Sequence, residues 1–472
     1  MTTDIFALIS PVEWFILTYF LIVNSVYAFT LLSAAREMRE HRRAVWGEDP
    51  YRLLSSEVSP TVSVLAPAYN EEVTVVASVR SLLNLHYSRL EVVVINDGSK
   101  DRTIEVLVQA FGLVPIEPTY DRRIETKALR GLYRCPEYPN LIVVDKENGG
   151  KADALNLGLQ VASGELICAM DADTLVEADA LTKMVRPFLS DTNVVCAGGT
   201  LRVLNASTVR SGRVVEARTP RQAVEGFQAV EYVRAFLFGR LGLNRLGGNL
   251  IISGAFGLFR RSSVIEADGY AHDSVGEDME LVVRLRRLGV ERGGPSEAVF
   301  IPDPVAWTEV PSSMKVLYRQ RDRWQRGLAD VLWRHRGMAF RPRFRAMGAF
   351  VYPYYVCVEL LSPIVEAAGI LLSIVEVWEH LVNAPFAVLF FLAAYGYGAL
   401  LSLFAMLLDE EIFGRYAGVK ERALLLLWAL LENVGYRQLL VVARLRGLTK
   451  FLTGDTSWGK MERKGITEAP KA

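Results

Sequence analysis

The amino-acid sequence predicts an α/β domain with a mostly parallel sheet, joined to helices that cross a membrane or lie at its surface. Between residues 61 and 300, short apolar runs typical of strands alternate with helical patterns, which favours a parallel sheet. Uncharged runs of bilayer length lie on both sides of this region. Hydrophobic residues make up 51% of the 472 residues, which is above the usual fraction for a soluble protein.

The pattern of charge and hydropathy predicts six segments. They are an N-terminal transmembrane anchor (1–35), a basic cytosolic linker (36–60), the α/β domain (61–300), interface helices (301–345), transmembrane helices (346–408) and an interfacial helix with a cytosolic tail (409–472).

The first segment contains an uncharged run from Trp14 to Leu32, which is about the length needed to cross a bilayer. Four arginines follow this run, and no Lys or Arg precedes it. The positive-inside rule therefore places the N-terminus outside and the following residues in the cytoplasm. The alternative is a cleaved signal peptide, since small residues follow at Ser33–Ala35, but a signal peptide carries its positive charge before the apolar run.

The predicted sheet begins with two strands that end in polar clusters. Val62–Ala66 is followed by Pro67 and by Tyr69-Asn70-Glu71, and Leu90–Asn96 is followed by Asp97-Gly98-Ser99. Helices are expected after each strand, and a further strand at 141–144. Ligands of parallel sheets bind at the carboxyl ends of strands, so both clusters are candidate ligand contacts.

A fourth apolar strand, 165–170, ends in Asp171-Ala172-Asp173. Two carboxylates at a strand end suit a divalent cation that is also bound by phosphate oxygens, because Mg²⁺ and Mn²⁺ prefer one or two protein carboxylates plus substrate phosphates. The alternative is a turn or a helix cap.

Two further motifs place charged groups at predicted helix starts. In Gly149-Gly150-Lys151, the lysine offers a point charge to a diphosphate, or it is a solvated lysine of an ordinary capped helix. In Gly276-Glu277-Asp278, a carboxylate could act as a general base on an acceptor hydroxyl, or it could cap the helix.

The run from Arg319 to Gly327 combines arginines with Trp324. An indole offers a flat face for a sugar ring, and arginines bind phosphate through paired hydrogen bonds. A basic helix attracted to anionic lipid is the alternative, although it does not explain the spacing of Gln320, Arg323 and Trp324.

The C-terminal part predicts two further crossings. An apolar region begins near Gly348 and carries Glu359 and Glu366, which share a helix face and either line a polar path or lie near the interface. Pro385–Leu408 is uncharged over its whole length. A third apolar run, 423–445, is interrupted by polar residues, so we expect an interfacial helix and a tail that returns to the cytoplasm.

The composition argues against other classes of protein. Lys and Arg number 53, as do Asp and Glu, so the net charge is zero and no nucleic-acid partner is expected. The four cysteines form no CxxC pair and the five histidines have no metal-binding spacing, which argues against disulfide scaffolds and zinc sites. No GxGxxG motif opens a helix, and no P-loop is present.

Together these motifs resemble family 2 glycosyltransferases, and within them the membrane-embedded synthases of cellulose, hyaluronan, chitin and poly-N-acetylglucosamine. The similarity runs from about residue 60 to 330 in the family's order of motifs: Ala66-Pro67-Ala68-Tyr69-Asn70-Glu71, Asp97-Gly98-Ser99, Asp171-Ala172-Asp173, Glu277-Asp278 and Gln320-Arg321-Asp322-Arg323-Trp324. The resemblance implies a GT-A fold, which is Rossmann-like, for the cytosolic domain of a multi-pass protein of the inner (plasma) membrane.

The resemblance also implies roles for individual residues. Pro67, Tyr69, Glu71, Asp97, Lys151 and Asp171 would bind the nucleotide sugar; Asp173 would bind Mg²⁺ or Mn²⁺; Asp278 would be the catalytic base; Gln320, Arg323, Trp324 and Phe256, in the loop Ser253–Gly257, would bind the acceptor and the diphosphate. The tail motif Ser457-Trp458-Gly459 is similar to one in hyaluronan and chitin synthases.

The implied activity is inverting transfer of a sugar from a UDP-sugar to a hydroxyl of a growing saccharide, with release of UDP. Glycolipid-forming members share the core and a similar Arg-Trp motif, so transfer of one sugar to a membrane lipid is the alternative. The base motif reads Gly-Glu-Asp where cellulose synthases commonly have Thr-Glu-Asp, and only about three crossings are expected. An export partner or an oligomer is therefore left open.

Overall fold

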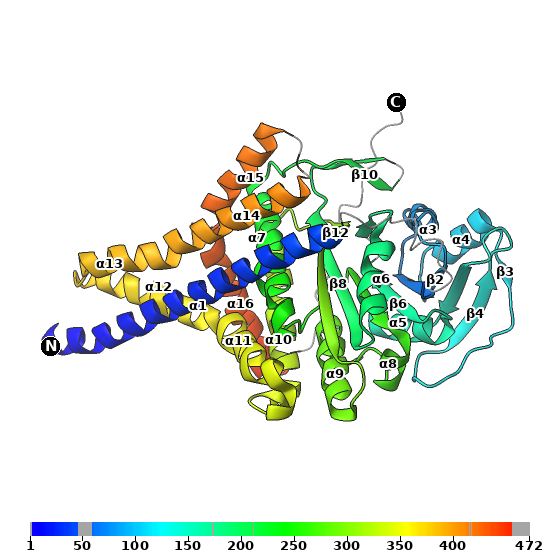
Figure 1. Cartoon of the computed structure of the whole chain (residues 1–472), viewed down its shortest axis with the longest axis horizontal. Helices are drawn as coiled ribbons and strands as arrows, with labels where there is room; N and C mark the ends of the chain where they lie inside the picture. Colours follow the sequence, from blue (N-terminus) through cyan, green and yellow to red (C-terminus); the bar gives the residue numbers. More distant parts are fainter. Residues whose placement is uncertain are drawn as a thin grey trace. The chain divides into compact units, whose positions relative to one another are not determined.

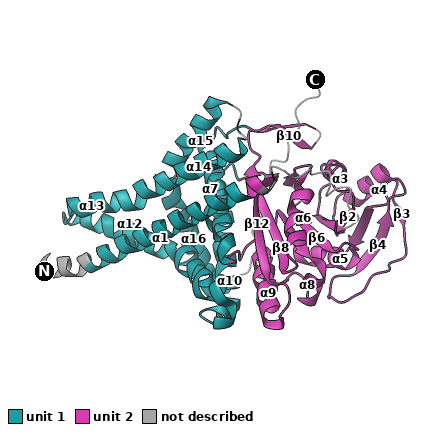
Figure 2. Ribbon diagram, in the orientation of Figure 1, with its two compact units in different colours: residues 1–40, 218–246, 311–462 teal, residues 41–217, 247–310, 463–472 magenta. Residues whose placement is uncertain are grey.

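The computed structural model describes residues 2–45, 59–171, 174–210, 212–414, 416 and 418–455. The chain forms two compact units (Figure 2). A helical unit comprises residues 1–40, 218–246 and 311–462, and a sheet unit comprises residues 41–217, 247–310 and 463–472. The predicted 61–300 domain therefore differs from the sheet unit in two ways: residues 218–246 belong to the helical unit, and the sheet unit continues to Val310 because its last strand crosses the predicted boundary.

Within the described residues, the sheet unit contains a ten-stranded sheet in the order β3-β4-β5-β2-β1-β6-β11-β8-β12-β7 (Figure 1). Neighbouring strands from β5 to β6 are parallel, as are β8 and β12, and antiparallel strands flank them. The strands are β1 (Val62–Ala68), β2 (Leu90–Asp97), β3 (Val114–Pro115), β4 (Leu129–Arg134), β5 (Leu141–Lys146), β6 (Leu166–Met170), β7 (Thr174–Val176), β8 (Val194–Val203), β11 (Phe256–Arg260) and β12 (Glu297–Thr308). The four strands predicted from the sequence are confirmed as β1, β2, β5 and β6.

The helices of this unit bury both faces of the sheet. They are α3 (Val75–Leu83), α4 (Thr103–Phe111), α5 (Lys151–Val161), α6 (Ala180–Ser190), α8 (Arg261–Glu266) and α9 (Glu277–Arg292). Leu65 and Val93 belong to a core that includes residues of α5, α8 and α9. Val64 and Val92, whose side chains point to the opposite face of the sheet from Leu65 and Val93, are also fully buried. This is typical of parallel strands that are covered on both faces.

The sequence from Arg202 to Gln222 predicts a surface loop, but the structure forms strands within it. β8 continues to Val203, and β9 (Thr208–Arg210) pairs with β10 (Arg213–Glu216) as an antiparallel hairpin. Arg202 is almost fully buried.

The helical unit contains three helices, within the described ranges, that are long and apolar enough to cross a membrane: Pro11–Arg43, Met347–Trp378 and Ala384–Phe413. They match the three predicted crossings in position. Its elements are α1 (Thr2–Val45, to residue 40), α7 (Ala223–Gly239), α10 (Met314–Arg334), α11 (Tyr352–Tyr354), α12 (Ser362–Trp378), α13 (Ala384–Phe391), α14 (Tyr397–Phe413), α15 (Val419–Leu431) and α16 (Tyr436–Leu452), with short 3₁₀ and π turns between them.

The region predicted to form one interfacial helix consists of α15 and α16, which are bent by 58° and together are apolar enough for a fourth span. α16 packs along α10. Lys450 of α16 lies 2.8 Å from the buried carboxylate of Asp322 on α10. The tail motif at 457–459 lies outside the described residues.

Two open alternatives from the sequence now have structural answers. The apolar sequence of residues 233–246 is compatible with either the membrane face or the core, and in the structure Val233, Phe236 and Leu241 are buried in the core. The Glu366 carboxylate lies 3.7 Å from the Arg437 guanidinium of α16, which favours a protein-facing position over the membrane interface.

Candidate active site

Lys151, the first residue of α5, meets carboxylates from two other elements of the sheet unit. Its ammonium lies 2.5 Å from the Asp171 carboxylate, directly after β6, and 3.7 Å from that of Glu277, the first residue of α9. Burial lowers the pKa of Lys151, but the charges of Asp171, Glu277 and Asp278 outweigh it and raise that pKa above its ordinary value. A permanent positive charge therefore stands where three elements converge, in a position suited to an anionic group.

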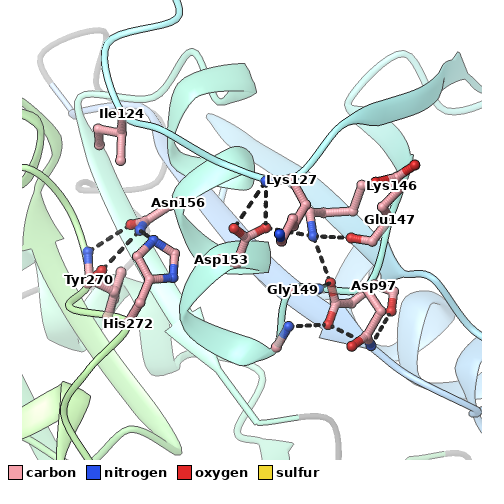
Figure 3. A network of polar contacts seen from close by, with 12 residues as sticks. Asp97, Ile124, Lys127, Lys146, Glu147, Gly149, Asp153, Asn156, Tyr270 and His272 are labelled. Atoms are coloured by element: carbon pink, nitrogen blue, oxygen red, sulfur yellow. Dashed lines mark hydrogen bonds and ion pairs between the residues drawn. The ribbon is translucent and has the colours of Figure 1, made fainter.

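Asp97 anchors the loop that places Lys151 (Figure 3). One carboxylate oxygen accepts hydrogen bonds from Lys146 Nζ (2.7 Å) and Gly149 N (2.9 Å). The other accepts from Asn148 Nδ2 (3.1 Å) and Gly150 N (2.8 Å). Because four protein donors use this carboxylate, its first task is to shape the turn into α5, and direct contact with the nucleotide remains a prediction.

Lys146 was missed by sequence reasoning. It is fully buried, and its ammonium lies between the carboxylates of Asp97 (2.7 Å) and Asp153 (2.6 Å). Lys146 ends β5 directly opposite Asp97 in the β2–β5 register. The sequence contained one indication of this pair: Asp97 and Lys146 both stand at the carboxyl ends of predicted strands.

Asp278 is the second residue of α9, and its carboxylate is held by two backbone donors. Oδ1 accepts from Met279 N at 2.8 Å, and Oδ2 accepts from Gly254 N at 3.0 Å. A Cβ built on Gly254 would lie 3.1 Å from Asp278 Oδ2 and 3.4 Å from Lys151 Nζ, so this loop passes close to both charges. The structure therefore brings Asp278, Lys151 and Asp171 together, as the sequence predicts.

The adjacent Glu277 is mostly buried, and burial raises its pKa, with Lys151 opposing that shift. Asp278 is half-buried and thus better placed to meet a substrate. The helix start has no side-chain cap, because its N-cap is Gly276. Asp278 bonds the Met279 amide and stands beside the Lys151 charge, and its role as the general base stays a prediction.

The ends of β1 and β2 are tied together, as expected for neighbouring parallel strands. Asn70 N donates to Ser99 Oγ at 3.0 Å, and Asn70 has a left-handed backbone (φ 57°). Tyr69 is 45% exposed and thus free to stack on a base. The Glu71 carboxylate accepts from Thr74 Oγ1 at 2.5 Å, and Pro67 is half-buried in β1.

Phe256 is not an acceptor contact, contrary to the sequence prediction. It is the first residue of β11, paired with Met170 of β6, and its side chain is completely buried. Strand alternation sends this ring into the core, so it cannot touch a substrate.

Gln320, Arg323 and Trp324 lie on α10 and belong to the helical unit. Their spacing of three and four residues places them on one side of the helix. Gln320 is buried, whereas Trp324 is 44% exposed.

The predicted metal ligand Asp173 lies outside the described residues. Among the residues that are described, no group of three or more His, Cys, Asp or Glu side chains could hold a metal ion. Asp171 itself follows a strand end, and its side chain is 31% exposed. A lone carboxylate of this kind fits Mg²⁺ or Mn²⁺, which take one or two protein carboxylates and complete their shell with phosphate and water.

Comparison with known proteins decides the family. A model described as glycosyl transferase family group 2 matches residues 166–407, more than half of the chain, and one described as glycosyl transferase family 2 matches residues 63–267. The chain is a family 2 glycosyltransferase. Its sheet unit accordingly has the GT-A fold expected from the sequence.

Curated relatives of this glycosyltransferase include a poly-β-1,6-N-acetyl-D-glucosamine synthase of Staphylococcus aureus (strain COL). It is 28% identical over 296 residues, which are 62% of this chain and 59% of the relative. The probable glycosyltransferase YdaM of Bacillus subtilis (strain 168) is 28% identical over 286 residues, 60% of this chain and 58% of YdaM. The matched region spans less than two thirds of each relative's length.

Similar solved structures include the mannosyltransferase PcManGT from Pyrobaculum calidifontis in complex with GDP-Man and Mn²⁺. Its TM-score is 0.46 at 17% identity, covering 90% of this chain and 99% of that one. Glucosyl-3-phosphoglycerate synthase from Mycobacterium tuberculosis has a TM-score of 0.36 at 18% identity, covering 61% and 84%.

Proposed function

We propose that this glycosyltransferase moves a sugar from a UDP-sugar to a hydroxyl of a growing polysaccharide or oligosaccharide, with inversion at the anomeric carbon and release of UDP. The observation that carries the proposal is the contact of Lys151 with Asp171 beside Asp278, because it sets a fixed positive charge next to a carboxylate held by backbone donors. The similarity to a poly-β-1,6-N-acetyl-D-glucosamine synthase supports a polysaccharide product over a glycolipid.

In the proposed reaction, Asp278 takes the proton of the acceptor hydroxyl. The hydroxyl oxygen forms a bond to the anomeric carbon, the bond from that carbon to the diphosphate oxygen breaks, and its electron pair leaves with UDP. Lys151 stabilises the charge that develops on the diphosphate. A general base typically contributes about a hundred- to ten-thousandfold in rate.

The other predicted residues complete the proposal. Tyr69 and Glu71 hold the uridine, and Gln320, Arg323 and Trp324 bind the acceptor end and the diphosphate. Asp171 and Asp173 would hold Mg²⁺ or Mn²⁺, which would add electrostatic stabilisation of the leaving group.

We also propose that the protein is a multi-pass protein of the inner (plasma) membrane with its sheet unit in the cytoplasm. The three membrane-length helices and the arginines that follow Leu32 support this orientation. The comparisons give no support to the oligomer or the export partner left open by the sequence.

The test is the purified full chain with a panel of UDP-sugars and Mg²⁺ or Mn²⁺, with UDP release and product mass as readouts. We expect a ladder of saccharides, and a single glycolipid product would contradict the polymer.

Asp278→Asn should nearly abolish transfer while donor binding survives. Asp179→Asn, at a 53% exposed carboxylate on the surface, is the matched control. Wild-type turnover of Asp278→Asn would refute the assignment of the base.

A further inference from the structure

Arg321 stands inside the predicted acceptor motif, between Gln320 and Trp324, but sequence reasoning gives it no task. Its guanidinium is only 4% exposed, although α10 carries many charged residues. A charge that is buried to this extent persists only where it is paired and hydrogen-bonded. Its contacts therefore show what the charge is used for.

On one side, Arg321 is fixed to two other helices of the helical unit. Its Nη2 lies 2.7 Å from Glu231 Oε2 on α7, and the same oxygen accepts a hydrogen bond from the Tyr436 hydroxyl of α16 at 2.9 Å. Burial raises the pKa of Glu231, but Arg321 outweighs that effect and holds the pKa below its usual value. Glu231 thus remains ionised as a permanent partner.

On the other side, Arg321 contacts both neighbouring acceptor residues. Nη1 donates to Gln320 Oε1 at 2.7 Å, and the guanidinium carbon lies 4.2 Å from the centre of the Trp324 ring. This distance is that of a cation–π contact. Trp324 is nearly half exposed, so Arg321 supports an indole whose remaining surface is open.

The contact also decides which end of the Gln320 amide is available. A guanidinium has only donors, so the atom that faces it must be the amide oxygen. The Nε2 group, with two donors, is left for another partner. Gln320 can therefore donate hydrogen bonds to a sugar or phosphate oxygen through Nε2, while its oxygen faces Arg321.

We propose that Arg321 is a positioning residue for the acceptor: it fixes the plane of the Trp324 indole and turns Gln320 so that this side chain acts as a hydrogen-bond donor. This inference rests on the proposed function and adds a specific arrangement to it. Lysine cannot replace arginine in this role, since an ammonium neither stacks flat on an indole nor offers a rigid fork of donors.

The test measures acceptor and donor kinetics separately, in the full chain, with the UDP-sugar that the wild type turns over fastest. Oligosaccharides purified from the wild-type reaction serve as acceptor primers. Arg321→Lys should raise the acceptor KM about tenfold while the donor Kd stays within twofold of wild type. Arg334→Lys, on the same helix and paired with Asp330, is the control and should leave both constants unchanged.

Three further measurements separate positioning from a merely structural role. With Trp324→Ala as background, Arg321→Lys should raise the acceptor KM by clearly less than in the wild type, because the indole that it orients is gone and only its effect on Gln320 remains. Methylguanidine added to Arg321→Ala should restore part of the acceptor affinity. Gln320→Glu keeps a partner for Arg321 but loses the donor, so it should raise the acceptor KM without lowering the unfolding temperature, even if the Arg321 variants fold poorly.

The outcomes distinguish a failure of the proposed function from a failure of the role assigned to Arg321. If the wild type releases no UDP with any donor, the proposed function fails and this inference falls with it. If the wild type is active and both Arg321→Lys and Gln320→Glu keep the wild-type acceptor KM, only this inference is overturned. Equal losses in donor and acceptor constants would also overturn it, since they indicate a structural role.

Discussion

Asp97 shows how one side chain can matter to a site by shaping it. Its four hydrogen bonds set the turn that ends at Lys151, so the aspartate positions the Lys151 charge through the backbone. Gly98, the next residue, makes that arrangement possible. It has a left-handed backbone (φ +64°), and a Cβ there would lie 2.5 Å from Asn148 N.

Gly98→Ala should therefore destabilise the protein more than Gly112→Ala. Both glycines have left-handed backbones, and each change costs about 1 kcal/mol for that conformation. A Cβ at Gly112 meets nothing within 4 Å, whereas a Cβ at Gly98 must push the Asn148 backbone away from Asp97. We expect a lower thermal midpoint for Gly98→Ala than for Gly112→Ala, and weaker UDP binding for Gly98→Ala alone. Equal midpoints for the two variants would show that the close approach carries no cost.

Lys146→Met should be among the most destabilising single changes in the sheet unit. It would leave the Asp97 and Asp153 carboxylates buried without their cation, and breaking a buried ion pair in this way costs roughly 3–5 kcal/mol. The exposed Lys100→Met is the control. Thermal unfolding of both variants in the same detergent provides the comparison, and a wild-type midpoint for Lys146→Met would refute the assigned role.

At the scale of elements, α5 connects the two halves of the proposed site. Its first turn carries Lys151, and its buried Asn156 clamps the loop before α9. Asn156 Oδ1 accepts from Tyr270 N at 2.7 Å, and its Nδ2 donates to Tyr270 O at 2.9 Å. Figure 3 shows this clamp on the same helix as the Asp97 network. Displacement of α5 would thus move both the Lys151 ammonium and the helix of Asp278.

Asn156→Ala should lower kcat more than the donor affinity, because it loosens the loop that leads to α9. Gln160→Ala is a matched control, since Gln160 is also a buried amide of α5 but bonds the backbone of Arg123 and Ile124. Each change leaves backbone groups unpaired, at about 1–3 kcal/mol. We expect the two variants to lose similar stability in thermal unfolding. Steady-state kinetics should show a lower kcat for Asn156→Ala alone. Identical kinetics in both variants would contradict the coupling.

The elements also show what a single sequence reveals. The apolar runs at β1, β2, β5 and β6 predict the parallel centre of the sheet, since each run is short and bounded by turn residues. The direction of one side chain is less predictable: Phe256 lies in a recognisable motif, but the register of β11 turns it into the core. Lys146 and Arg321 depend on contacts between distant segments, which a local pattern does not contain. The apolar sequence of helix α7 likewise does not indicate whether the helix belongs to the sheet unit or to the helical unit.

At the scale of the whole molecule, the decisive question is how often the chain crosses the membrane. On the proposed topology, α12 and α14 would supply two crossings after α1, and the bent pair α15–α16 would supply another only if it were one span. α16 argues against this, because Lys450 pairs with the buried Asp322 of the polar helix α10. A lysine held at that helix stays with protein and water, so we expect three crossings.

Cysteine labelling tests this topology. With Cys357 replaced by serine, single cysteines are introduced at Glu379, between α12 and α13, and at Gly414, after α14. On the proposed orientation, with the arginines after Leu32 in the cytoplasm, the loop at Glu379 would lie outside and Gly414 inside. A membrane-impermeant maleimide should therefore label position 379 in right-side-out vesicles and position 414 in inside-out vesicles. A third cysteine at Asp455, after α16, should follow position 414, because three crossings leave both on the same side. Labelling of position 455 together with position 379 would instead make α15–α16 a fourth span and would overturn the expectation of three crossings.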